Sequence, residues 1–140
     1  MTDRVRMVFE ILDDLNKTLP VDKDRVYVCG LSMGGYGTWD VLCRDPNRFA
    51  AGLICCGGGD AKVAAAKLKD KPLWIVHGDH DGAVPHTNAV EIVAALKAAG
   101  SKSFTYTQLP GYGHNVWGWT FGNKEILNWL FSQKIVQRDF

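Results

Sequence analysis

The chain has 140 residues, of which 46% are hydrophobic and 22% charged, and its formal net charge is +1. These values are ordinary for one globular domain over residues 1–140, and they exclude an intrinsically disordered chain. Acidic and basic residues are interspersed without a basic run, so neither nucleic acid nor an anionic membrane is predicted as a partner.

The first ten residues, MTDRVRMVFE, carry charges where a secretion signal would have an apolar run. No signal is therefore predicted, and the cellular compartment stays open. The apolar stretches of the sequence have the length of single strands, and none is long enough to span a bilayer.

Helix and strand signals alternate from the start of the chain. Residues 3–16 place apolar side chains at a helical spacing, which predicts an amphipathic helix that ends before Pro20. A β-branched run at 25–29 predicts the first strand. The glycine-rich segment 30–35 follows it and leads into a helix that ends near Arg44.

The rest of the chain continues this alternation. The last predicted strand alternates in polarity, so that one face is more exposed, as is typical of an edge strand. The predicted elements are strands at 50–56, 72–77 and 103–109, and helices at 61–69, 88–99 and 123–133.

Strands separated by helices favour right-handed crossover connections and a parallel sheet. The first three predicted strands are almost continuously apolar, which is typical of strands covered on both faces. The sequence therefore predicts an α/β fold, with a parallel sheet of about four strands and helices on both faces. In such folds functional groups gather at the carboxyl ends of the strands, so the loops that follow each strand are the place to look for chemistry.

The four cysteines show no spacing typical of a metal site. Cys29, Cys43, Cys55 and Cys56 form no CxxC pair, and no histidines stand at zinc-ligand spacing from them. Adjacent residues of a strand point to opposite faces, which disfavours a bond between Cys55 and Cys56. We expect free, mostly buried thiols and no metal site.

The segment Gly30-Leu-Ser-Met-Gly34 fits the pattern G-x-S-x-G and lies between a predicted strand and a predicted helix. There the serine occupies a strained turn that exposes its Oγ, and the turn is expected to need small residues two positions to either side. The N–H of Met33 points to the same place, at the positive end of the new helix. We predict Ser32 as a nucleophile and the Met33 N–H as an oxyanion donor. A glycine–serine turn without a catalytic role is the alternative.

A serine hydroxyl needs a base that takes its proton. His114 follows the last predicted strand, in GYGHNVW (111–117), and is the predicted base. His77 ends a strand and is expected to be a packed structural residue. His80 lies in the loop after that strand, and His86 opens the next helix as a cap or surface group.

The loop HGDHDGAVP (77–85) offers two carboxylates at the exit of the third strand. We predict that Asp81 orients the imidazole and stabilises its charged form. Asp79 is expected to tie the loop through backbone hydrogen bonds. The alternative for Asp81 is a purely turn-stabilising role before Gly82.

Three blocks resemble α/β-hydrolase carboxylesterases, namely GLSMGGYGTW (30–39), HGDHDGAVP (77–85) and GYGHNVW (111–117). The nearest groups are the peptidase/phospholipase-carboxylesterase and dienelactone-hydrolase-like families, near feruloyl and acetylxylan esterases. The blocks follow the order nucleophile, acid, base that this fold uses. The resemblance spans essentially the whole chain. It implies a serine hydrolase that cleaves small-molecule carboxylic esters through an acyl-enzyme intermediate, without a metal or organic cofactor.

The sequence also departs from these families. They have strands ahead of the helix with which this chain begins, and a loop after one of those strands supplies a second oxyanion N–H. This sequence therefore looks like the C-terminal part of such a catalytic domain. We expect the strand at 25–29 to expose an unpaired edge and to associate with a missing N-terminal segment or with a second copy of the chain.

Aromatic residues near the predicted nucleophile and base are the one hint of substrate. Tyr36 and Trp117 are expected to line a pocket for an aromatic or sugar-linked acyl group, with simple packing as the alternative. Trp39 is expected to pack in the core. Two other functions stay open: a serine peptidase of the prolyl-oligopeptidase type with the same three residues, and a catalytically weak or silent hydrolase fragment that needs a partner chain.

Overall fold

The computed structural model describes residues 3–136 and contains one four-stranded parallel sheet. Its two central strands are buried over almost their whole length, as their apolar sequences require. The strands lie side by side in chain order: β1 (Tyr27–Leu31), β2 (Ala51–Cys55), β3 (Leu73–Gly78) and β4 (Phe104–Leu109). The predicted α/β fold class is confirmed.

The register of the sheet aligns the carboxyl ends of the strands. Leu31, the last residue of β1, stands beside Cys55 of β2, which in turn stands beside Val76 of β3. Gly78, at the end of β3, stands beside Leu109 of β4. The loops that follow the four strands therefore leave the sheet along one edge.

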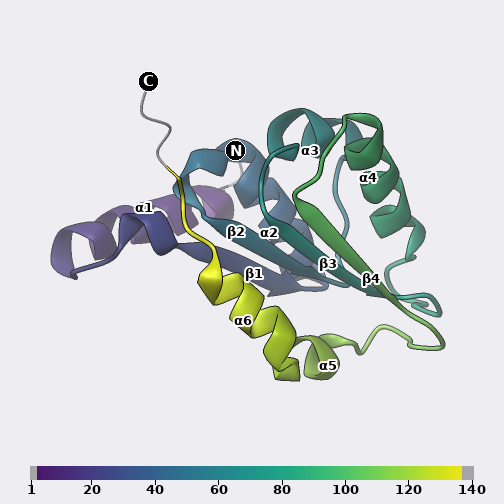
Figure 1. The fold of residues 1–140 in the computed structure, drawn as a ribbon. Helices are drawn as coiled ribbons and strands as arrows, with labels where there is room; N and C mark the ends of the chain where they lie inside the picture. Colours follow the sequence, from purple (N-terminus) through teal and green to yellow (C-terminus); the bar gives the residue numbers. More distant parts are fainter. Residues whose placement is uncertain (1–2, 137–140) are drawn as a thin grey trace.

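Helices cover both faces of the sheet (Figure 1). The three helices that connect successive strands pack on one face together with the first helix, because right-handed crossovers place them all on the same side. The last two helices pack on the other face. The helices are α1 (Asp3–Thr18), α2 (Met33–Arg44), α3 (Ala61–Leu68), α4 (Thr87–Ala98), α5 (Trp117–Gly122) and α6 (Lys124–Ser132).

Each face of the sheet has its own hydrophobic core. The larger core lies under α1 to α4, and the smaller one lies under α5 and α6. Successive strand residues alternate between them, as Leu53 and Ile54 of β2 do. Burial of each such side chain contributes about 1.5–3 kcal/mol relative to exposure. None of the helices in residues 3–136 is both long and apolar enough to cross a membrane.

The first strand begins later than the sequence predicts. The apolar run indicates a strand at 25–29, whereas β1 starts at Tyr27. A short helix, η1 (Lys23–Arg25), occupies the start of that run because the Asp22 carboxylate accepts a hydrogen bond from the Asp24 N–H at 3.1 Å. The β-branched pattern does not reveal this side-chain cap.

The predicted helix at 123–133 is present as α6, but the segment 110–122, predicted to be a loop, contains a further short helix. The helix α5 precedes α6, and Asn123 separates them with an extended backbone. Its side chain accepts hydrogen bonds from the N–H groups of Glu125 and Ile126, which caps α6. The sequence WGWTFG does not predict α5, because glycine is a poor helix former.

Candidate active site

The turn between β1 and α2 holds its serine in an unusual backbone conformation. Ser32 has φ 53° and ψ −119°, a region that residues with a side chain rarely adopt. Its N–H donates to the Cys55 carbonyl at 2.9 Å, which fixes the turn to the end of β2. The strained strand–turn–helix geometry is the one in which a G-x-S-x-G serine projects its hydroxyl from the sheet edge.

Glycine is required at two positions of this turn, one before Ser32 and one after it. A Cβ on Gly30 would lie 2.1 Å from the Gly34 carbonyl oxygen, and one on Gly35 would lie 2.8 Å from the Cα of Gly57. A Cβ on Gly34 would meet no atom of the described residues within 4 Å. The expectation that the turn needs a small residue two positions to either side is therefore wrong at Gly34, because that position faces open space.

The structure brings Ser32, Asp81 and His114 together. The Nε2 atom of His114 lies 2.8 Å from Ser32 Oγ, and its Nδ1 atom lies 2.8 Å from Asp81 Oδ2. The serine follows β1, the aspartate lies in the loop after β3, and the histidine lies in the loop after β4. Both distances are in the range of direct hydrogen bonds. The imidazole thus bridges a hydroxyl and a carboxylate.

The carboxylate of Asp81 is enclosed and well supplied with donors. The residue is only 8% exposed. Burial by itself would raise the pKa of Asp81, but hydrogen bonds from the His114 side chain and from the N–H groups of Val84 and Ala83 outweigh it. The pKa of Asp81 is therefore below its ordinary value, so the group stays a carboxylate at neutral pH.

Asp79 joins the aspartate loop to the histidine loop. Its Oδ1 accepts hydrogen bonds from the ring Nδ1 of His80 at 2.6 Å and from the Gly111 N–H at 2.7 Å. These two bonds lower the pKa of Asp79. The sequence predicts that Asp79 ties its loop through backbone hydrogen bonds, and the Gly111 contact has this character, although it reaches across to the next loop.

The other histidines lie away from Ser32 Oγ. His80 is exposed, and His86 stands at the N-terminus of α4 without a capping side-chain hydrogen bond. His77 is completely buried, as a packed residue would be. Its Nε2 atom lies 3.2 Å from Asp81 Oδ2, a contact that the sequence pattern did not indicate.

Met33 begins α2 directly after Ser32. The first N–H groups of a helix have no partner within the helix, so this N–H is free to face a negative oxygen near Ser32 Oγ. The side chain of Met33 is 79% exposed, so this side of the turn is open.

Cys56 is a neighbour of the site that sequence reasoning missed. It follows β2, is fully buried, and has a left-handed backbone with φ 43°. A hydrogen bond from the Cys55 thiol lowers the pKa of Cys56 against the effect of burial, and the Ser32 N–H and His114 act in the same direction. The glycine run 57–59 that follows β2 was the available signal for an irregular exit from this strand. All four cysteines are free, as expected.

The two aromatic residues that the sequence places in the site differ in their surroundings. Tyr36 is exposed on α2 and, with Trp39, Val63 and the glycines after β2, lines a groove of about 460 Å³. The ring of Trp117 is half-buried and packs edge-to-face on the His114 ring, with 5.7 Å between centroids. Trp39 is 3% exposed and lies in the core, as expected.

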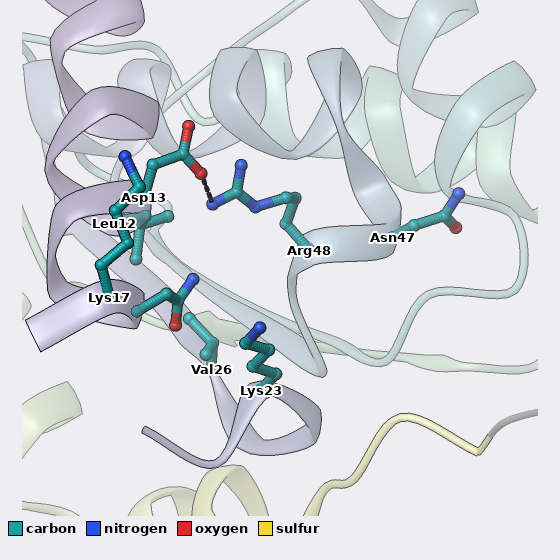
Figure 2. A pocket seen from close by; sticks show the side chains of 8 residues that line it. Leu12, Asp13, Lys17, Lys23, Val26, Asn47 and Arg48 are labelled. Carbon is teal, nitrogen blue, oxygen red and sulfur yellow. Dashed lines mark hydrogen bonds and ion pairs between the residues drawn. The ribbon is translucent and has the colours of Figure 1, made fainter. Parts of the chain in front are cut away.

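A second pocket lies at the opposite end of the sheet (Figure 2). It has a volume of about 480 Å³ and is lined by α1, η1 and η2 (Pro46–Arg48). Arg48 pairs with Asp13 across it at 2.7 Å. Val26, which also lines it, precedes β1, whereas Ser32 follows that strand. This pocket is therefore remote from Ser32, Asp81 and His114. Residues 3–136 contain no group of three or more His, Cys, Asp or Glu side chains that could hold a metal.

Comparisons with known proteins give a consistent picture of the fold. A model of the prolyl oligopeptidase family matches residues 60–132. The bifunctional acetylxylan esterase/xylanase XynS20E of Neocallimastix patriciarum is 32% identical over 80 residues, which cover 57% of this chain and 12% of that protein.

Among solved structures, a thermostable esterase is 35% identical with a TM-score of 0.91, and the match covers 96% of this chain and 38% of that chain. SOBER1 of Arabidopsis thaliana is 23% identical with a TM-score of 0.68, over 91% of this chain and 60% of that chain, which shows the fold alone. The chain thus spans well under half of the esterase. The fold is part of an α/β-hydrolase fold, as the sequence resemblance implied.

Proposed function

The chain belongs to the prolyl oligopeptidase family. Within this family we propose that it is a serine hydrolase that cleaves carboxylic esters through an acyl-enzyme intermediate. One observation carries the proposal, namely the continuous contact from Ser32 Oγ through the His114 ring to Asp81 Oδ2, with 2.8 Å at each step. A hydroxyl, an imidazole and a buried carboxylate in this arrangement are the parts that nucleophilic acyl transfer requires.

In the first half of the proposed reaction, Ser32 Oγ forms a bond to the acyl carbon and its proton moves to His114 Nε2. The carbonyl oxygen becomes negative and accepts a hydrogen bond from the Met33 N–H. Asp81 keeps the imidazole in the tautomer that presents Nε2 to the serine and stabilises the imidazolium. When the intermediate collapses, His114 gives the proton to the departing alcohol, which leaves the acyl group on Ser32.

In the second half, water takes the place of the alcohol. It gives a proton to His114 and attacks the acyl carbon, and the acid leaves as the proton returns to Ser32 Oγ. Each step reuses the same groups, since acid and base roles reverse between the two halves.

An ester is favoured over a peptide as the substrate for two reasons. XynS20E is a bifunctional acetylxylan esterase/xylanase, and the similar solved structure is a thermostable esterase. In addition, the Met33 N–H is the one oxyanion donor that we assign within residues 3–136, and loss of one donor typically costs about 10²–10³ in turnover. An activated ester needs less stabilisation of the negative oxygen than an amide does. The family name keeps a peptidase as the second candidate.

The substrate surface that we propose is the groove beside Tyr36. This residue stands one helical turn after Ser32, and the groove that its ring helps to form is largely apolar. Trp117 packs on the His114 ring and does not line this groove. A short acyl chain or an aromatic ring would fit such a surface.

We also propose that the free edge of β1 pairs with a further strand. Within residues 3–136, β1 pairs with β2 alone. Leu31 and Cys29 are exposed there, and an apolar strand with unpaired backbone groups favours pairing. The strand could come from an upstream segment or from a second copy. A stable monomer in sedimentation at micromolar concentration would contradict pairing with a second copy.

The test of the proposed function is hydrolysis of p-nitrophenyl acetate and butyrate by the wild type and by Ser32→Ala. We expect the wild type to turn over both esters and the variant to lose at least about 10³-fold in kcat. Equal rates for the two proteins would contradict the proposal. Aminoacyl p-nitroanilides, cleaved faster than the esters, would favour the peptidase.

A further inference from the structure

His77 is the one buried imidazole outside the contact chain of Ser32, His114 and Asp81. It lies near the end of β3, on the same face as Leu73 and Ile75 by the alternation of the strand. Its side chain is 0% exposed, so each ring nitrogen needs a partner within the protein or remains unsatisfied.

The contacts of this ring fix where its proton lies. The Nε2 atom is 2.8 Å from the Val84 carbonyl oxygen, which can only accept a hydrogen bond. Nε2 therefore carries the hydrogen. The Nδ1 atom is buried and has no partner among the described residues, which suits a lone pair better than an N–H group.

The Nε2 atom also lies close to the carboxylate of Asp81, although its hydrogen is directed at the Val84 carbonyl. Oδ2 of Asp81 is 3.2 Å from His77 Nε2 and 2.8 Å from His114 Nδ1, so this oxygen lies between two imidazoles. The other oxygen, Oδ1, accepts from the Ala83 and Val84 N–H groups at 2.9 and 2.8 Å. The carboxylate thus accepts hydrogen bonds from the loop at Oδ1 and from His114 at Oδ2, and the His77 ring lies against Oδ2.

From this arrangement we infer that His77 is a positioning residue, whose Nε2–H holds the Val84 carbonyl and whose ring contacts Oδ2 of Asp81, so that this oxygen stays in line with Nδ1 of His114. The inference rests on the proposed function. The two N–H groups of the loop hold Oδ1 alone, so the carboxylate could still rotate about that anchor. A donor on strand β3 limits this freedom, because it fixes the Val84 residue whose N–H binds Oδ1, and its ring occupies the space beside Oδ2.

Two substitutions of similar size separate this role from simple packing. Gln carries an amide nitrogen at about the reach of Nε2, whereas Leu fills space without a donor. We expect His77→Leu to lower kcat for p-nitrophenyl butyrate by roughly 10- to 100-fold with KM little changed, since a misplaced catalytic group costs about this much. His77→Gln is expected to recover most of that loss.

Thr120→Val is the matched control. Thr120 is also completely buried, and its hydroxyl donates to the Val116 carbonyl at 2.7 Å, on the other face of the sheet. The variant loses this buried hydrogen bond and the 3.4 Å contact of the hydroxyl with Cys55 Sγ, and it leaves the hydrogen bonds of Asp81 in place. It is expected to lower the thermal midpoint of unfolding, as His77→Leu does, and to leave kcat within about twofold of the wild type.

If His77→Leu does not fold, kcat is compared between His77→Gln and His77→Asn instead. The Asn amide reaches the position of Nδ1 and not that of Nε2, so Asn is expected to lose activity where Gln keeps it. Equal activity of Gln with either Leu or Asn, or a folded Leu variant with wild-type kcat, would overturn the inference.

A spectroscopic reading does not depend on turnover. Proton NMR should show a downfield signal for His114 Nδ1–H, bonded to Asp81, which weakens or moves upfield in His77→Leu and returns in His77→Gln. A signal that is the same in all three proteins would count against the inference. The outcome for the proposed function is separate, because Ser32→Ala alone decides it.

Discussion

The two halves of the candidate active site differ in how completely residues 3–136 enclose them. On the acid–base side, Asp81 is 8% exposed and accepts from the side chain of His114 and from two N–H groups of its own loop. On the oxyanion side, Met33 is 79% exposed and β1 has a free edge. In the proposed function, the groups that transfer the proton thus all lie within residues 3–136, whereas the Met33 N–H is the one donor assigned to the negative oxygen.

The groups proposed to transfer the proton and the group proposed to stabilise the negative oxygen thus come from separate parts of the fold. The loops after β3 and β4 lock one another through Asp79 and Gly111. The turn after β1 is fixed to β2 through Ser32 and Cys55, and its outer side is open. Substitutions on the enclosed side should therefore lower both the stability of the fold and kcat. Substitutions on the open side should not lower the stability of the fold.

The largest expected effect on the enclosed side is that of Asp81→Asn. An amide in place of the carboxylate leaves the shape of the loop but favours the wrong tautomer of His114 and does not stabilise its charge. We expect kcat to fall roughly 10⁴-fold, as measured with p-nitrophenyl butyrate. A loss of less than about tenfold would show that Asp81 has only the turn-stabilising role.

The glycines offer a direct comparison of the two sides in stability. A Cβ on Gly78 would lie 2.3 Å from the Tyr112 carbonyl oxygen and 2.5 Å from that of Gly113, where two backbones meet. Gly78→Ala should therefore destabilise the fold by about 1–3 kcal/mol. Gly34→Ala, on the open side, should range from neutral to about 1 kcal/mol stabilising. Urea denaturation measures both, and equal shifts would break the comparison.

The pH dependence of stability provides a further distinction. The pKa of Asp81 is lower in the folded chain than its ordinary value, so its carboxylate contributes stability above that value and loses it as pH falls through the folded pKa. The difference in unfolding free energy between wild type and Asp81→Asn should be constant from about pH 5 to 8 and narrow below about pH 4. A difference that grows on acidification would contradict the direction of the shift.

The smallest expected effect is on substrate binding at the groove. Tyr36→Ala should raise KM for p-nitrophenyl butyrate roughly 2- to 10-fold with kcat retained, since one aromatic contact contributes about 0.5–1.5 kcal/mol. Tyr36→Phe keeps the ring and is the control, with an unchanged KM. An equal effect of the two variants would assign the change to the hydroxyl.

The sequence could predict the fold and the meeting of the three loops because both depend on local signals. Short stretches of sequence determine the strand–turn–helix context around Ser32 and the strand ends before Asp81 and His114. Parallel strands then bring their carboxyl ends together. The contact of His77 with Asp81 depends on the path of the loop that follows β3. The left-handed backbone of Cys56 depends likewise on how β2 leaves the sheet, and the glycine run 57–59 signals an irregular exit without specifying its path.

The most direct test of the central claim is covalent labelling of the wild-type chain with a fluorophosphonate. Ser32 Oγ bonds to phosphorus, fluoride leaves, and the hydroxyl proton passes to His114, so labelling reports the activated serine without an ester turnover. Mass spectrometry should find one adduct, on Ser32, which is absent in Ser32→Ala and strongly reduced in His114→Ala. An unlabelled wild type, or an adduct that survives both substitutions, would contradict the claim that these residues act together.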